Sequence, residues 1–235
     1  MVIKRHLAVY TGSFDPITLG HLDVLARARG MFDEIVLAIG HNPSKPALFS
    51  FEERLELARG CVADMLKAEP EGAPVRVEVY TGLTVDFARS VGAVAIVRGI
   101  RNVTDLANEC QLAITNRQVA NIETVFVVTG ESYAYTSSSL IKQIAAFGGT
   151  IEKLVPLVPK RVIEALARKK GDPTNPLGKL AAEHHGGGVV CGGRRGRRPS
   201  VTSITAGSSR RSCAWLSSSV ALHASHGERP LAGAS

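Results

Sequence analysis

The chain has 235 residues, of which 45% are hydrophobic and 21% are charged, a balance typical of a soluble globular protein with one or two domains. No apolar run approaches the ~18 residues that a membrane-spanning helix needs, and the first residues lack the long apolar stretch of a signal peptide. We therefore expect a cytoplasmic protein with no membrane partner. The four cysteines, Cys61, Cys110, Cys191 and Cys213, form no CxxC pair, so neither a zinc site nor a disulfide framework is indicated.

The net charge of +7 is unevenly distributed along the chain. Residues 171–235 hold 8 basic and 3 acidic residues, whereas residues 1–170 hold 20 and 18. The segment 171–235 is rich in Gly, Ser and Arg and has no sustained periodicity, so we expect an extension that is disordered or derives from vector sequence beside a histidine tag. A basic arm that binds RNA or membranes is the alternative, although neither is the partner we expect.

Residues 1–170 alternate short apolar runs with amphipathic segments. The runs predict strands at Leu7–Tyr10, Ile35–Ile39, Val75–Tyr80, Val94–Val97 and Thr124–Val128. The segments between and after them predict helices at Leu19–Met31, Ser50–Leu66, Leu83–Val91, Thr104–Val119, Ser138–Phe147 and Lys160–Lys170. Strands rich in Val and Ile are typical of a sheet that is covered on both faces. We therefore expect an α/β fold, a Rossmann-like doubly wound five-stranded parallel sheet with helices on both faces.

The stretch TGSFDPITLGH, residues 11–21, joins the first predicted strand to the first predicted helix. Ligands of open parallel sheets bind at the carboxyl ends of the strands, which is where this stretch lies. Thr18 is a suitable N-cap and places His21 at the third helical position. Because the N–H groups of a first helical turn bind anions, the stretch predicts a phosphate site with His21 above it. A histidine that only caps the helix or lies at the surface is the other interpretation.

Two more features suit phosphate binding. Arg98 directly follows the fourth apolar run, so we expect it at a strand's carboxyl end, where a guanidinium can hold a phosphate through two hydrogen bonds. Ser137-Ser138-Ser139 opens the fifth predicted helix and offers hydroxyls and free N–H groups to an anion. A surface-capping arginine and a flexible serine loop are the alternatives at these two places.

The motif Ser13-Phe14-Asp15-Pro16 followed by Thr18-Leu19-Gly20-His21 resembles the T/HxGH signature of the nucleotidyltransferase superfamily. Further stretches are similar to the bacterial phosphopantetheine adenylyltransferase family: NPSK (42–45), FSFEER (49–54), VRGIR (97–101), NECQLAITNR (108–117) and YTSSSLIK (135–142). The resemblance covers residues 7–168. It implies reversible transfer of an adenylyl group from ATP to 4′-phosphopantetheine, giving dephospho-coenzyme A and pyrophosphate. It also implies Mg²⁺, bound mainly through the ATP phosphates, and a homo-oligomer, usually a hexamer.

The same resemblance implies roles for individual residues. His21 matches the histidine that stabilises the transition state at the α-phosphate, and Lys45 and Arg98 match the other catalytic positions. The residues that match ATP contacts are Ser13, Phe14, His21, Gly99, Ile100, Arg101, Glu109, Tyr133, Ala134, Tyr135, Thr136, Ser137, Ser138 and Ser139. The residues that match phosphopantetheine contacts are Ser13, Lys45, Thr84 and Arg98. No residue is assigned as a metal ligand.

The chain departs from the family pattern in one segment. Residues Asp105–Glu109 read DLANE where the family has roughly DFEYE, and Thr115 stands where methionine is usual. This segment helps to shape the pantetheine pocket and the subunit contacts. An adenylyl- or cytidylyltransferase with another acceptor, such as nicotinate mononucleotide, is the near alternative, and a catalytically silent relative is a further one.

Overall fold

A computed structural model of the chain describes residues 5–40, 47–147, 150–172, 174 and 177. The chain divides into two units, residues 1–189 and 190–235, and all described residues belong to the first. The strands are β1 (Leu7–Gly12), β2 (Glu34–Gly40), β3 (Val75–Tyr80), β4 (Ala95–Ile100) and β5 (Glu123–Val128). The α-helices are α1 (Leu19–Arg29), α2 (Phe51–Ala68), α3 (Thr84–Ser90), α4 (Val103–Ala120), α5 (Ser138–Ala146) and α6 (Lys160–Gly171). Short 3₁₀ helices, η1 (Glu131–Tyr133) and η2 (Ile151–Leu154), flank α5 in the chain.

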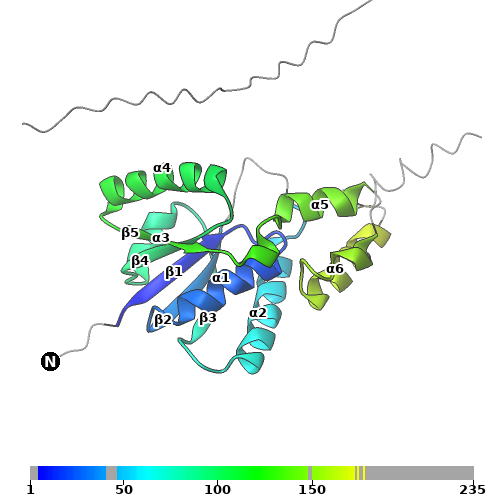
Figure 1. The fold of residues 1–235 in the computed structure, drawn as a ribbon, viewed down its shortest axis with the longest axis horizontal. Coiled ribbons are helices and arrows are strands. Elements are labelled where there is room, and N and C mark those ends of the chain that lie inside the picture. The colour runs from blue at the N-terminus through cyan, green and yellow to red at the C-terminus, as the bar shows by residue number, and fades with distance from the viewer. Residues whose placement is uncertain (1–4, 41–46, 148–149, 173, 175–176, 178–235) are drawn as a thin grey trace, which may run out of the picture. The chain divides into compact units, whose positions relative to one another are not determined.

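The five strands pair in parallel in the order β3-β2-β1-β4-β5 (Figure 1). In this order β2 and β3 are added on one side of β1, and β4 and β5 are then added on its other side. The carboxyl ends of β1 and β4 therefore form the topological switch point, where ligands of such sheets bind. The Rossmann-like fold predicted from the sequence is confirmed.

Side chains of the central strands alternate between two cores. From β1, Ala8 and Tyr10 join the core beneath α1, α2, α5 and α6, whereas Leu7 and Val9 join Val85 of α3 in the core on the opposite face. Figure 1 shows these helices on both sides of the sheet. Burial on both faces explains why the strands read as nearly continuous runs of Val and Ile rather than as an alternating pattern.

The predicted limits of the elements hold to within a few residues. Ser50 caps α2 in a capping box: its hydroxyl accepts the N–H of Glu53 at 3.2 Å, and the Glu53 carboxylate accepts the N–H of Ser50 at 2.8 Å. The fourth strand was predicted too short. Because its pairing with β5 continues to Ile100, Arg98 lies inside β4 rather than after it.

Two predicted features lie outside the described residues, namely Lys45 and almost all of the extension 171–235. Leu177 is described and lies beyond the predicted domain end at residue 170. Its side chain is only 4% exposed and belongs to the core that includes Leu166 of α6. In the described ranges, every helix is too short or too polar to cross a membrane.

Candidate active site

A cavity of about 250 Å³ lies where β1 and β4 end. Its wall comes from the loop after β1, the first turns of α1 and α5, β4 and α4. Eleven of the predicted site residues line it: Ser13, Phe14, His21, Arg98, Gly99, Arg101, Glu109, Thr136, Ser137, Ser138 and Ser139. The starts of α1 and α5 therefore face one cavity.

Both helix starts are capped by neutral hydroxyl groups. Thr18 caps α1, and Ser137 caps α5 by accepting the N–H of Leu140 at 3.1 Å. Neither first turn contains an acidic residue, in contrast to α2, whose first turn holds Glu52 and Glu53. The positive ends of α1 and α5 are thus not neutralised by their own carboxylates, and both can attract a bound anion.

The imidazole of His21 closes a capping box with Thr18. The N–H of Thr18 donates to Nδ1 of His21 at 3.0 Å, and the N–H of His21 donates to the Thr18 hydroxyl at 3.3 Å. A backbone N–H can only donate, so Nδ1 must be unprotonated and the ring proton must be on Nε2. His21 therefore carries its one N–H donor on the nitrogen that the cap does not use.

His21 is held in the neutral form by its surroundings. Burial, followed by the charges of Arg101 and Arg98, lowers the pKa of His21 to about 4. The ring also packs edge-on against Phe14, with 5.1 Å between the ring centroids. At neutral pH the side chain is thus an oriented hydrogen-bond donor without a positive charge of its own.

Arg98 is fixed by two contacts in the cavity wall. Its guanidinium binds the Glu109 carboxylate through two hydrogen bonds of 2.7 and 2.5 Å, and Nη1 donates to the carbonyl of Thr11 at 2.7 Å. Burial alone would lower the pKa of Arg98, but the hydrogen bonds and charge of Glu109 outweigh it, and this pKa is raised. Glu109, which the resemblance implies as a nucleotide contact, here orients the arginine.

A second arginine–carboxylate pair lies beside the first. Arg101 donates to Asp105 at 2.8 and 3.0 Å and to the carbonyl of Thr136 at 2.7 Å, so it connects α4 with the segment that leads into α5. Asp105 was not among the residues predicted to form the site. Arg101 and Asp105 have opposite charges and are four residues apart, which could have indicated the pair. The same spacing is equally common on the exposed surface of a helix, so it does not point to a site.

Two glycines of the motifs lie at close contacts between elements. A Cβ at Gly99 would lie 2.9 Å from a methyl group of Val24, so a side chain would force β4 and α1 apart. At Gly20, a Cβ would lie 3.3 Å from the Cβ of Tyr133. These contacts bring α1 close to β4 and to η1, and they set the position of the first helical turn that contains His21.

Four further residues that were predicted to contact ATP do not line this cavity. Ile100 is buried in the sheet, and Tyr133 packs against Gly20. Ala134 is absent from the cavity wall, and Tyr135 is 91% exposed. The nucleotide contacts assigned to these four residues by resemblance stay predictions.

Thr84 lines a smaller cavity of about 100 Å³ that adjoins the first. Three residues, Thr11, Arg98 and Glu109, belong to the walls of both cavities. The other lining residues mix apolar and polar groups: Ile96, Leu112, Ala113, Asn116 and Thr124. The Thr124 hydroxyl is buried without a hydrogen-bond partner among the described residues.

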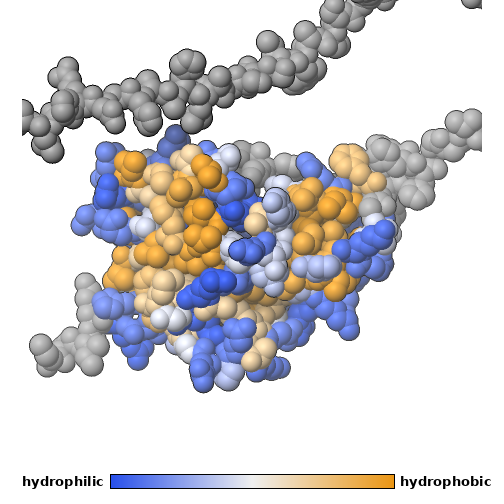
Figure 2. Space-filling model, in the orientation of Figure 1, coloured by the Kyte–Doolittle hydropathy of each residue, from blue (hydrophilic) through white to orange (hydrophobic). Residues whose placement is uncertain are grey.

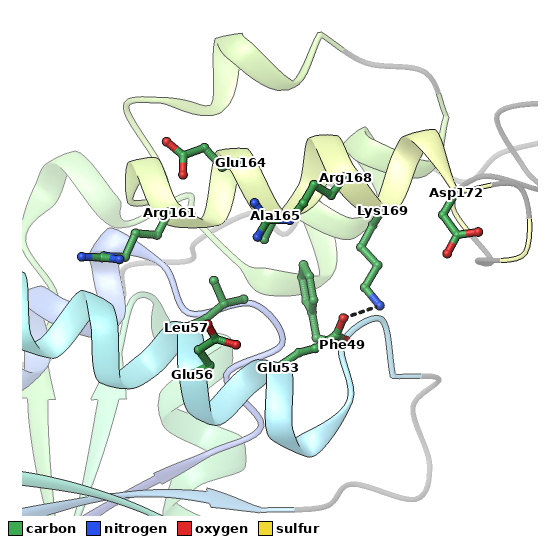
Figure 3. Close-up of a pocket in the computed structure, with 10 residues that line it drawn as sticks. All are labelled: Phe49, Glu53, Glu56, Leu57, Arg161, Glu164, Ala165, Arg168, Lys169 and Asp172. Carbon is green, nitrogen blue, oxygen red and sulfur yellow. Dashed lines mark ion pairs between the residues drawn. The ribbon is translucent and has the colours of Figure 1, made fainter.

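A larger cavity of about 550 Å³ lies between α2 and α6 (Figure 3). None of the predicted site residues line it, and its charged residues include both signs. Lys169 reaches across to Glu53 at 2.7 Å, which joins the two helices at this place. Its lining shows no arrangement that selects a particular ligand.

Carboxylates near the main cavity are already paired. Glu109 binds Arg98 and Asp105 binds Arg101, and the described residues contain no cluster of three or more His, Cys, Asp or Glu that could hold a metal. A metal ion at this site would consequently need most of its ligands from phosphate oxygens and water, which is how Mg²⁺ commonly binds.

An open parallel sheet with a T-x-G-H helix start at its switch point is the architecture of a nucleotidyltransferase. The cytidylyltransferase-like family model matches residues 9–144, and the chain belongs to this family. Two curated relatives are more specific. The chain is 46% identical over 173 residues to a phosphopantetheine adenylyltransferase of Rhodopirellula baltica, covering 73% of this chain and 93% of the relative. It is 45% identical over 168 residues to one of Desulforudis audaxviator, covering 71% and 98%.

Within that larger family, the chain is therefore a member of the phosphopantetheine adenylyltransferases, as the sequence motifs indicated. Solved structures agree on the fold. A bifunctional NMN adenylyltransferase/ADP ribose pyrophosphatase of Francisella tularensis matches with a TM-score of 0.53 at 18% identity, covering 77% of this chain and 54% of that one.

Proposed function

We propose that the chain transfers an adenylyl group reversibly from ATP to 4′-phosphopantetheine, giving dephospho-coenzyme A and pyrophosphate. The observation that supports this best is the shared cavity, into which two uncompensated helix starts and two arginines project. A triphosphate needs several positive groups at separate points along its length. A second phosphate compound needs a further cation and room for its own chain, which Arg98 and the adjoining small cavity offer.

In this proposal the ATP phosphates bind along the two helix starts. The β- and γ-phosphates lie at the first turn of α5, where Ser137–Ser139 supply hydroxyl and N–H donors. The α-phosphate lies at the first turn of α1, where Nε2 of His21 donates a hydrogen bond. That hydrogen bond strengthens as negative charge builds up on the α-phosphate oxygens, so it stabilises the transition state more than bound ATP.

The chemical step needs no protein nucleophile. A phosphate oxygen of phosphopantetheine attacks the α-phosphorus, and the bond from that phosphorus to the oxygen of pyrophosphate breaks. Catalysis then depends on alignment and on stabilisation of charge. Arg98, held extended by Glu109, orients the attacking phosphate, and Lys45 is proposed to contact the same group. A Mg²⁺ ion would be held chiefly by ATP phosphates and water, and it would supply positive charge beside the pyrophosphate.

The small cavity beside Arg98 is suited to the pantetheine arm. Ile96, Leu112 and Ala113 contribute apolar surface, and Asn116 contributes a polar group. A pantetheine arm is an apolar chain interrupted by amides. Its apolar segments can pack against the apolar lining residues, and its amides can form hydrogen bonds with Asn116. A nicotinate ring, by contrast, is flat and rigid and has no such series of amides.

The proposal includes a homo-oligomer, a hexamer by family resemblance, assembled through α4. Ala120 is the only buried residue of α4, while Val103, Leu112, Ile114 and Val119 are 49–82% exposed. Figure 2 shows hydrophobic residues gathered over α4 and β5. Exposed apolar surface of this kind is typical of an interface.

Light scattering tests the oligomer. The chain should give a mass above the 24.9 kDa of one copy, and Val119→Glu should lower the mass. A monomeric unmodified chain would contradict the proposed homo-oligomer.

A cytoplasmic location belongs to the same proposal. Its support is the choice of ATP as substrate and the free thiols of Cys61 and Cys110, because cytoplasmic cysteines are kept reduced.

The decisive experiment is a substrate panel. Pyrophosphate release from ATP and Mg²⁺ is measured with 4′-phosphopantetheine, nicotinate mononucleotide or glycerol 3-phosphate as the acceptor. We expect turnover with phosphopantetheine and rates near the blank with the other two. Higher turnover with nicotinate mononucleotide would show that the proposed acceptor is wrong but that adenylyl transfer is right. No turnover with any acceptor would contradict the proposed activity.

A further inference from the structure

The carboxylate of Asp15 is buried next to the cavity but does not line it. Only 3% of the residue is exposed. Its oxygens accept the N–H groups of Leu48 and Phe49, both at 2.9 Å, and the ammonium group of Lys142 at 3.0 Å. A buried carboxylate keeps its charge only with such compensation. Asp15 thereby joins three segments: the loop after β1, the residues just before α2, and α5.

Lys142 and Ser138 hold α5 to the same loop. Ser138 lies one helical turn before Lys142, and its hydroxyl donates to the carbonyl of Pro16 at 2.8 Å. Neighbouring residues of the loop, Asp15 and Pro16, thus bind successive turns of α5. The loop then continues through Thr18, which is 2% exposed, into the first turn of α1. The contacts form a short and tightly packed connection between the start of α5 and His21.

We propose that Asp15 and Lys142 are positioning residues that hold the start of α5 at the separation from His21 that a polyphosphate chain needs in order to contact both. This inference rests on the proposed function, because it specifies how that site grips ATP. Neither residue touches the ligand. The pair acts through Ser138 and the first turn of α5, and the required alignment is within fractions of an ångström.

Ligands of different length distinguish positioning from general stability. ATP spans both helix starts, whereas AMP places its single phosphate at the α1 start alone. Loosening the connection should weaken ATP binding and leave AMP binding nearly unchanged. A loss of folded protein would lower the apparent affinity for both by the same factor. Binding measured by titration calorimetry needs no turnover, so the test is independent of the acceptor.

The variant of choice is Lys142→Met, which keeps the length of the apolar stem and leaves Asp15 its two backbone donors. We expect ATP affinity to fall about tenfold, the scale of a small misplacement, and AMP affinity to stay within about twofold. Lys142→Arg can still reach Asp15 and should restore ATP affinity. The matched control is Lys169→Met, which removes the 2.7 Å ion pair between Lys169 of α6 and Glu53 of α2 (Figure 3). The side chain of Lys169 is 20% exposed and that of Lys142 is 22% exposed, so the two substitutions are made at equally buried lysines.

Thermal unfolding of each variant establishes that it is folded. If Lys142→Met does not fold, Lys142→Gln, which retains a polar head, is measured in its place. Equal loss of ATP and AMP affinity, the same ATP loss in Lys169→Met, or unchanged ATP affinity would each overturn the positioning role. If Lys142→Met loses affinity for ATP but not for AMP, and phosphopantetheine is not adenylylated by the unmodified chain, only the proposed acceptor is wrong. If the unmodified chain binds neither nucleotide, both proposals fall.

Discussion

The neutral state of His21 predicts a specific loss of stability in acid. An ordinary histidine has a pKa of 6.5, while the folded protein lowers the pKa of His21 to about 4. Between these values the unfolded chain binds a proton that the folded chain does not, so stability falls as the pH drops from about 6.5 toward 4 and levels off below. Between pH 7 and pH 4.5 the free energy of unfolding should fall by at most about 2 kcal/mol because of this residue. The value is an upper limit because the ring borders an open cavity, where solvent reduces the cost of a charge.

His21→Gln isolates this contribution. Glutamine at the third helical position can still accept the N–H of Thr18 and so retains the capping box, but it does not titrate. Urea unfolding at pH 7 and pH 4.5 should show that the unmodified chain loses about 1–2 kcal/mol more than the variant. Carboxylates titrate in both proteins and cancel in the difference.

Equal acid sensitivity in the unmodified chain and His21→Gln would refute the neutral imidazole. A nitrogen NMR spectrum at pH 7 gives a second check, since a protonated Nδ1 would contradict the hydrogen bond from Thr18. For the reaction itself, kcat should show no ionisation of His21 between pH 5.5 and 8.

Further predictions concern catalysis and packing. His21→Ala should lower kcat by ~10²-fold or more, as expected for loss of one transition-state donor, with ATP still bound; a near-normal kcat would remove that role. Arg98→Ala should raise the KM for phosphopantetheine ~10-fold or more, from loss of charge-assisted hydrogen bonds, and an effect confined to the KM of ATP would oppose the assignment. Gly99→Ala should reduce the free energy of unfolding by ~1–3 kcal/mol through its clash with Val24, measurable in urea. A chain ending at residue 178 should keep full turnover, whereas one ending at 171 should be less stable by ~1.5–3 kcal/mol, because it lacks the buried Leu177.

Sequence and structure agree best where the signal is local. The strands were found because burial on both faces demands continuous Val and Ile, and the start of α1 was found because Thr18 and His21 have the spacing of a cap. The two anion sites at the helix starts follow from the same local chemistry. Their placement in one cavity depends in addition on the strand order, which sets β4 beside β1 and β5 beside β4.

Residues with long-range partners were missed or read differently. Asp15 was identified only as part of a motif, whereas its burial and its bond to Lys142 depend on how α5 packs. Glu109 was expected at the nucleotide, and only the structure shows it gripping Arg98. Gly99 matched a motif, while the reason it must be glycine is the approach of Val24 from another element.

The sequence by itself determined the elements, their caps, the parallel sheet and the family, since each depends on spacing within a few residues or on motifs read in order. Tertiary structure decided the protonated nitrogen of His21, the pairing of both arginines and the connection between the two helix starts. These depend on distances between residues far apart in the chain, and a hydrogen bond or a pKa shift arises only after folding has removed water and brought such groups together.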